Sequence, residues 1–129
     1  MKKIIPFLMA LLLLAGCGAQ SEESTYRQVN AEEAAAMMEE ESGYLILDVR
    51  TAGEYSEKHI PGAINIPNET IGDQDIPELP DKEQLILVYC RSGNRSKQAS
   101  EKLVKLGYTN IVEFGGINDW TGETVSGEA

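Results

Sequence analysis

Two nearly continuous apolar runs of strand length constrain the fold of this chain more than any other feature. They cover residues 44–49 (YLILDV) and 84–89 (QLILVY). A strand that is apolar throughout, rather than at alternate positions, is typical of a central parallel strand covered on both faces. Strand and helix patterns alternate around these runs, which predicts an α/β fold with a mainly parallel sheet flanked by helices.

Two of the predicted helices begin at recognisable capping residues. Asn30 with Glu33, and likewise Thr51 with Glu54, have the spacing of a capping box. Ser42-Gly43 and Ile60-Pro61-Gly62 are expected to end these two helices. Further expected elements are short strands at 63–66 and 110–114, a surface connection at 67–82, a helix at 96–106 and a short final helix through Trp120.

Residues 1–16 have the pattern of a secretory targeting segment, with Lys2 and Lys3 before an apolar run. The run is shorter than the roughly 20 residues of a membrane-spanning helix, so we expect cleavage. The junction LAGC, ending at Cys17, resembles the bacterial lipobox, whose cysteine is lipidated; the alternative is an ordinary secretory signal with a coincidental cysteine. A lipid on Cys17 predicts an extracytoplasmic bacterial lipoprotein, anchored to the cell membrane through a flexible tether at residues 17–24.

The rest of the chain has room for one domain. We expect it at residues 25–121, followed by a disordered acidic tail at residues 122–129. The formal net charge of −10 excludes nonspecific binding to nucleic acid and is typical of a soluble, highly charged surface. We expect a monomer.

The segment CRSGNRS, residues 90–96, connects the second apolar run to the helix expected after it. In parallel α/β sheets, ligands bind beyond the carboxyl ends of the strands, where this loop is expected to lie. Its backbone N–H groups can converge on the Cys90 thiol, and the helix N-terminus, Arg91 and Arg95 add positive charge. Such surroundings lower the pKa of a thiol and supply a nucleophilic thiolate near neutral pH.

Small and hydroxyl-bearing residues complete this loop. Gly93 suits a tight turn with positive φ, and Ser92 and Ser96 can donate hydroxyl hydrogen bonds to the sulfur. The alternative is that Cys90 is an inert buried residue, the commoner state of a lone cysteine. If Cys17 is lipidated, Cys90 is the one free thiol of the chain, which excludes an intramolecular disulfide and a dithiol redox mechanism.

Five motifs, in order along residues 26–120, resemble the signatures of the rhodanese family. They are DVR at 48–50, EY at 54–55, HIPGA with NIP at 59–67, CRSGNRS at 90–96, and GG with Trp120 at 115–120. Each motif alone is weakly specific, whereas the five together are strongly specific. The resemblance implies a mainly parallel five-stranded sheet of the rhodanese type, flanked by helices.

The resemblance also implies a sulfurtransferase. Cys90 would attack the outer, sulfane sulfur of thiosulfate or a persulfide, become a cysteine persulfide, and pass that sulfur to a thiol or to cyanide. The loop amides would stabilise the anionic sulfur, and Arg91 and Arg95 would attract an anionic donor. Neither a metal nor an organic cofactor is expected. The substrate-binding residues that the motif implies are Arg91, Ser92, Gly93, Asn94, Arg95 and Ser96.

Four polar residues outside the loop are interpreted as structural. Asp48 and Arg50 end a strand, and Arg50 is expected to pair with Glu54 across the turn, with substrate contact as the alternative. His59, the one histidine, is expected to anchor a loop by hydrogen bonding, as in the family, with a general-base role as the alternative. Trp120 is expected to fill the core beneath the glycine pair.

Three other functions stay open. Phosphatases of this general architecture have a longer spacing between cysteine and arginine, which fits a phosphate, whereas Arg95 follows Cys90 after four intervening residues. A binding or sulfur-sensing module at the cell envelope would use the same loop without turnover. A redox role would need mixed disulfides with the thiols of other exported proteins. The presence of the thiol and of both arginines favours the enzyme.

Overall fold

The computed structural model describes residues 25–127, which form a single parallel sheet covered by helices. The strand order is β1-β5-β4-β2-β3, and every neighbouring pair is parallel. The predicted α/β fold with a five-stranded sheet is confirmed. The short edge strand β1 is the one strand that the residue patterns did not predict. The strands are β1 (Arg27–Gln28), β2 (Leu45–Asp48), β3 (Ile64–Asn65), β4 (Ile86–Cys90) and β5 (Ile111–Gly116).

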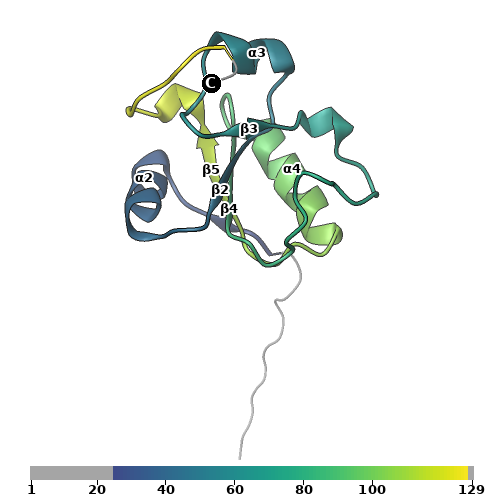
Figure 1. The fold of residues 1–129 in the computed structure, drawn as a ribbon. Coiled ribbons are helices and arrows are strands. Elements are labelled where there is room, and N and C mark those ends of the chain that lie inside the picture. The colour runs from purple at the N-terminus through teal and green to yellow at the C-terminus, as the bar shows by residue number, and fades with distance from the viewer. Residues whose placement is uncertain (1–24, 128–129) are drawn as a thin grey trace, which may run out of the picture.

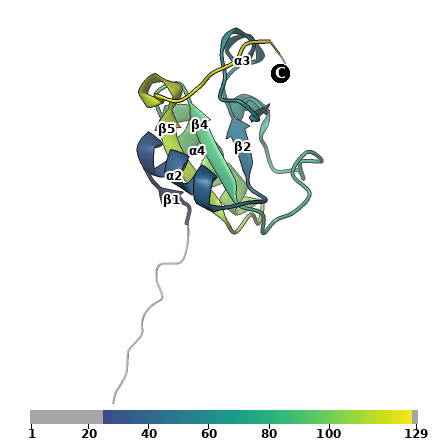
Figure 2. The same ribbon diagram turned by 60° about the vertical axis from the view of Figure 1, so that its left-hand side comes forward.

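The two apolar runs become β2 and β4, which lie inside the sheet and are covered on both faces (Figure 1). Successive β4 side chains point to opposite faces, with Val88 and Cys90 in one core cluster and Leu87 and Tyr89 in the other. Helix α4 (Asn94–Lys105) covers the first face and α2 (Ala31–Glu40) covers the second; Figure 2 is turned so that α2 lies in front of the strands.

The helix starts follow from local hydrogen bonds. Both predicted capping boxes are present, at Asn30 for α2 and at Thr51 for α3 (Ala52–Glu57). The helix predicted at 96–106 begins earlier, at Asn94, because Gly93 adopts a φ of 118° and turns the chain directly from the loop into α4.

The segment at residues 67–82, expected to be a surface connection, contributes to the core. It contains the short 3-10 helix η1 (Asn68–Thr70), and three of its apolar residues pack in the cluster beneath α4. An irregular backbone hid this contribution from pattern analysis, because its apolar residues follow neither a helical nor a strand period. The three residues are Ile71, Ile76 and Leu79.

The C-terminal segment is more ordered than predicted. After η2 (Ile117–Asp119), Val125 forms an antiparallel bridge with His59, and the Gly127 amide donates to the Ser56 carbonyl at 2.7 Å. Within the segment predicted to be a disordered tail, the backbone of Val125 and Gly127 therefore has hydrogen-bond partners at His59 and Ser56.

The predicted signal segment, the tether and the lipidation residue Cys17 lie outside the described residues, as do residues 128–129. Between residues 25 and 127, no helix combines the length and the apolar character needed to cross a membrane.

Candidate active site

Cys90 is the last residue of β4, and the loop after it wraps around its sulfur. The thiol is buried, with the residue 1% exposed, and the Gly93 amide nitrogen donates to Sγ at 3.0 Å. Burial raises the pKa of the Cys90 thiol, but the hydrogen bond between the thiol and the Ser96 side chain and those from the backbone N–H groups of Ser96, Gly93 and Ser92 more than offset it. The net effect is a pKa below the ordinary value, as expected for a loop that stabilises a thiolate.

The close approach of β5 to this loop requires glycine at position 116. Cys90 pairs with Gly116 across the sheet, and the Asn118 amide donates to the Arg91 carbonyl at 3.2 Å. A Cβ atom on Gly116 would lie 1.9 Å from the Arg91 carbonyl oxygen, which no side chain tolerates. The glycine pair of the sequence motif therefore lets β5 support the Cys90 loop.

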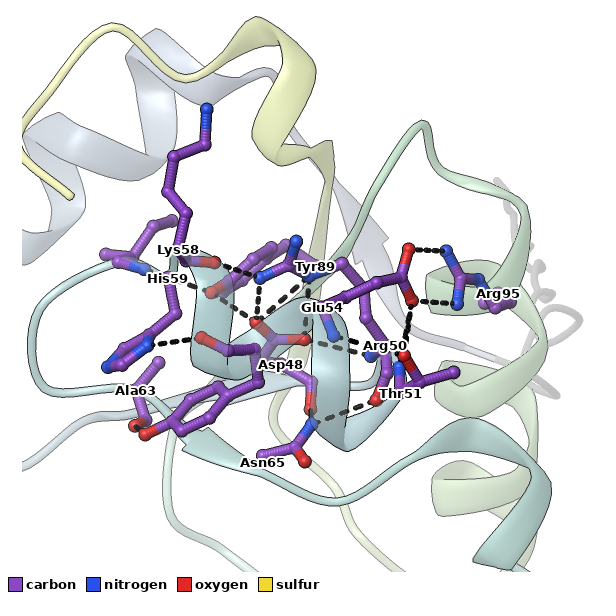
Figure 3. A network of polar contacts seen from close by, with 12 residues as sticks. Asp48, Arg50, Thr51, Glu54, Lys58, His59, Ala63, Asn65, Tyr89 and Arg95 are labelled. Carbon is purple, nitrogen blue, oxygen red and sulfur yellow. Dashed lines mark hydrogen bonds and ion pairs between the residues drawn. The ribbon is translucent and has the colours of Figure 1, made fainter. Parts of the chain in front are cut away.

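The two arginines of the loop differ in their surroundings. Arg91 is exposed, whereas Arg95 makes a two-point ion pair with Glu54, at 2.7 Å from Nη1 to Oε1 and 3.1 Å from Nη2 to Oε2 (Figure 3). The hydrogen bond from Arg95 and those from Thr51 lower the pKa of Glu54 to about 2. Much of the Arg95 charge is therefore balanced by Glu54, which leaves Arg91 as the more accessible cation of the loop.

The predicted pairing of Arg50 with Glu54 is wrong. Arg50 folds back on Asp48, with 2.7 Å between Nη2 and Oδ2, and the same Nη2 donates to the Lys58 carbonyl at 2.6 Å. Arg50 follows Asp48 by two residues at the end of β2, so its side chain reaches that carboxylate within the turn, while Glu54 on α3 faces the first turn of α4.

Asp48 organises the end of the strand that carries the cysteine. It is fully buried and accepts hydrogen bonds from the Tyr89 hydroxyl at 2.7 Å and from the Arg50 backbone amide at 2.9 Å. The Tyr89 hydroxyl in turn accepts from the Ile60 amide at 3.1 Å. Burial and the nearby Asp48 carboxylate raise the pKa of Tyr89. Because Tyr89 directly precedes Cys90, this network holds the end of β4 in place.

His59 lies in the connection between α3 and β3. Its ring is fully buried, stacks on the Tyr55 ring with 3.8 Å between centroids, and brings Nδ1 within 2.8 Å of the Tyr55 carbonyl oxygen. Its backbone also pairs with Val125. These contacts anchor the connection between α3 and β3.

Glu113 is a residue near the site that the sequence interpretation missed. It is 2% exposed, and its carboxylate accepts a hydrogen bond from the Ser96 hydroxyl at 2.5 Å. Ser96 in turn lies 3.4 Å from the Cys90 sulfur. The signal in the sequence was a single carboxylate inside the apolar strand IVEF.

A polar hollow of about 210 Å³ lies beside the loop. Its charged side chains come from the loop, from the end of β2 and from α3, and Arg91 is among them. In the described part of the chain, no cluster of three or more histidine, cysteine or carboxylate side chains has the arrangement of a metal site. The hollow is lined by Arg50, Glu54, Glu57, Lys58, Arg91, Ile117 and Asn118.

The structure combines a parallel sheet with a buried thiol at the carboxyl end of its central strand, and a strand-to-helix loop encloses that thiol. Residues 30–123 match the family model described as the rhodanese-like domain. The chain therefore belongs to the rhodanese-like family.

Relatives and solved structures agree with this assignment. Thiosulfate sulfurtransferase PspE of Escherichia coli (strain K12) is 40% identical over 73 residues, which cover 57% of this chain and 70% of that protein. Thiosulfate sulfurtransferase GlpE of Pseudomonas entomophila (strain L48) is 32% identical over 111 residues, 82% of this chain and 98% of that protein. A solved rhodanese with anions from E. coli superposes with a TM-score of 0.60 at 37% identity, covering 65% of this chain and 99% of that one. These relatives support sulfur transfer of the rhodanese type.

Proposed function

We propose that this protein is a thiosulfate or persulfide sulfurtransferase that works through a persulfide on Cys90. The observation that carries the proposal is the convergence of loop N–H groups on the sulfur, with the Gly93 amide nitrogen 3.0 Å from Sγ. Donors in this arrangement stabilise an anionic sulfur, whether it belongs to the attacking thiolate or to the persulfide. The names of the relatives support the same chemistry.

The proposed reaction has two displacement steps. In the first, the Cys90 thiolate attacks the outer sulfur of thiosulfate; an Sγ–S bond forms, the S–S bond of the donor breaks, and sulfite leaves with the bonding electron pair. In the second, a thiolate or cyanide attacks the outer sulfur of the persulfide, the Sγ–S bond breaks, and the Cys90 thiolate is restored. Neither step requires a metal or an organic cofactor.

We assign different roles to the two arginines. Arg91 is exposed at the polar hollow beside the loop and can meet an anionic donor directly. Arg95 is held by Glu54 and supports the loop from the α4 side. Arg91→Ala is therefore expected to raise the KM for thiosulfate more than it lowers kcat. Ser92 and Asn94, exposed on the same loop, and the buried Ser96 complete the proposed binding residues.

We also propose that Cys17 carries a lipid and that the domain acts, as a monomer, at the outer face of the cell membrane. The support is the LAGC junction after the apolar segment. In this place the acceptor would be a small thiol, cyanide or an exported thiol protein rather than a cytosolic carrier. Cys17→Ser is expected to release the protein from the membrane fraction; persistence of the variant in that fraction would contradict the anchor.

Steady-state kinetics test the proposed reaction. Thiocyanate formation from thiosulfate and cyanide should give parallel double-reciprocal lines, because sulfite leaves before cyanide binds. Cys90→Ser should abolish turnover. Turnover that survives in Cys90→Ser would overturn the mechanism. If thiosulfate and persulfide donors both give no turnover in the unaltered protein, the non-catalytic binding or sulfur-sensing module becomes the better account.

A further inference from the structure

Glu113 is a buried carboxylate in the interior of a parallel sheet. It lies in β5 opposite Val88 of β4, and its sequence neighbours Val112 and Phe114 are core residues. The residue is 2% exposed. Removing a carboxylate from water is costly unless hydrogen bonds compensate for the lost hydration. We therefore expect the Glu113 carboxylate to have several hydrogen-bond donors around it.

Hydrogen bonds from three parts of the chain converge on the Glu113 carboxylate. Oε2 accepts from the Ser96 hydroxyl at 2.5 Å and from the Gly115 amide at 2.9 Å. Oε1 accepts from Nε2 of Gln28, on the edge strand β1, at 3.3 Å. One carboxylate oxygen thus connects the start of α4 to the end of β5, and both segments border the Cys90 loop.

The Ser96 hydroxyl carries a single proton, for which several acceptors compete. Its Oγ lies 3.0 Å from the Gly93 carbonyl oxygen, 3.3 Å from that of Gly115, and 3.4 Å from the Cys90 sulfur. The Glu113 oxygen is the nearest acceptor, at 2.5 Å, and it belongs to a group that carries charge when ionised. A hydrogen bond to an ionised acceptor is roughly twice as strong as a neutral one. The Ser96 proton is therefore drawn toward Glu113 and away from the sulfur.

We propose that Glu113 is a positioning residue that sets the acidity of Cys90 through the Ser96 hydroxyl. While the carboxylate accepts the Ser96 hydrogen bond, Oγ presents its lone pairs to Cys90 and accepts a hydrogen bond from the thiol. The hydroxyl then stabilises the thiolate less than it would without Glu113, and the backbone N–H groups of the loop supply more of the stabilisation. Glu113 thereby keeps the pKa of the Cys90 thiol higher than it would be in the same loop without this carboxylate. The consequence for sulfur transfer rests on the proposed function, whereas the effect on thiol acidity rests on these contacts alone.

Other titratable and charged groups lie around Cys90 and Glu113. Arg95, on α4, interacts with Cys90 through its charge, but its guanidinium is bound to Glu54. On the opposite side, burial and the charges of Glu101 and Glu113 raise the pKa of Tyr26. The contact to Glu113 from β1 comes from Gln28, which is neutral.

The pH dependence of Cys90 alkylation by iodoacetamide tests the proposal, because it reports the thiol pKa without requiring turnover. Glu113→Gln keeps the shape and the hydrogen-bonding oxygen but removes the charge, so the Ser96 proton can turn to the thiolate. We expect the apparent pKa of Cys90 to fall by about half a unit to one unit. Glu101→Gln, an exposed change on α4, is the matched control and should leave the profile unchanged.

A double-mutant cycle with Ser96→Ala separates action through the hydroxyl from direct repulsion by the carboxylate. With Ser96 removed, Glu113→Gln should shift the Cys90 pKa by less than half as much as it does with Ser96 present. An unchanged profile for Glu113→Gln would overturn the proposal. So would a shift of equal size in both backgrounds, because the charge would then act without Ser96.

A measurement on the unaltered protein covers the case in which Glu113→Gln does not fold. The carboxyl ¹³C shift of Glu113, followed by NMR across the titration of Cys90, should show an inflection at the Cys90 pKa. The inflection should be absent in Cys90→Ser. A Glu113 carboxyl signal that does not respond to Cys90 ionisation would contradict the coupling. This result does not depend on whether the protein shows sulfur-transfer activity.

Discussion

Arg95 and Glu54 form a two-point ion pair that connects the first turn of α4 to the first turn of α3. The two nitrogen–oxygen distances are 2.7 and 3.1 Å, and the two side chains are 31% and 25% exposed. The same glutamate accepts from the Thr51 amide as part of the α3 capping box. The Glu54 carboxylate thus fixes the position of α3 relative to the Cys90 loop.

The first prediction concerns the pH dependence of this pair. Because the Arg95 hydrogen bond holds the pKa of Glu54 at about 2, below its ordinary value of 4.5, the pair stabilises the fold above about pH 4.5 and loses this effect as the pH falls toward 2. Glu54→Gln should lower the free energy of unfolding by about 1 kcal/mol at pH 7, a modest value because both partners are partly exposed.

Urea unfolding of Glu54→Gln and of the unaltered protein at several pH values measures this effect. The difference between the two should shrink as the pH falls from 5 to 2. Glu57→Gln, an exposed change on the same helix, is the control and should make no difference at any pH. A difference for Glu54→Gln that stays constant across this range would contradict the assignment.

The second prediction concerns the buried network at the end of β2. Asp48 is 0% exposed and Arg50 4% exposed, so Asp48→Asn leaves the guanidinium buried without its counter-charge. We expect a loss of about 3 to 5 kcal/mol in the free energy of unfolding, measured in urea. Exposed Asp73→Asn is the control, with an effect within about 0.5 kcal/mol. A loss below about 1 kcal/mol for Asp48→Asn would show that the network contributes little to stability.

The third prediction concerns the contact between β5 and the Cys90 loop. In Gly116→Ala, the new methyl group would lie 1.9 Å from the Arg91 carbonyl oxygen, so the loop must move. A displacement of about 1 Å at a catalytic group can cost about 100-fold in rate, and we expect a loss of that order in kcat/KM for thiosulfate. Gly53→Ala, which places its methyl group in open space on α3, should leave turnover unchanged. Comparable activity of the two variants would mean that the loop does not depend on this contact.

Local patterns predicted much of the fold. The two central strands are nearly continuous apolar runs, and the two capping boxes depend on residues three positions apart, so short windows of sequence contain the information. The edge strand β1 has two residues, and its pairing with β5 is a long-range contact that no local pattern encodes.

The candidate site was predictable to the extent that it lies in one loop. Cys90 ends β4, Gly93 lies in the loop and Ser96 is in the first turn of α4, and their convergence follows from this tight strand-to-helix turn. The partners from elsewhere were not predictable: Glu54 and Arg95 are 41 positions apart, and Ser96 and Glu113 are 17 apart. Arg50 was assigned the wrong partner because two carboxylates, Asp48 and Glu54, lie close to it in sequence, and side-chain direction decides between them.

If Cys90 carries sulfur between donor and acceptor, the intact mass of the purified protein changes with each half of the reaction. Mass spectra are taken before and after exposure to thiosulfate, and again after cyanide, beside a Cys90→Ser control. We expect a gain of one sulfur atom after thiosulfate, its loss to cyanide as thiocyanate, and no change in the control. A Cys90 that stays unmodified by thiosulfate and by persulfide donors alike, in a folded protein, would contradict it.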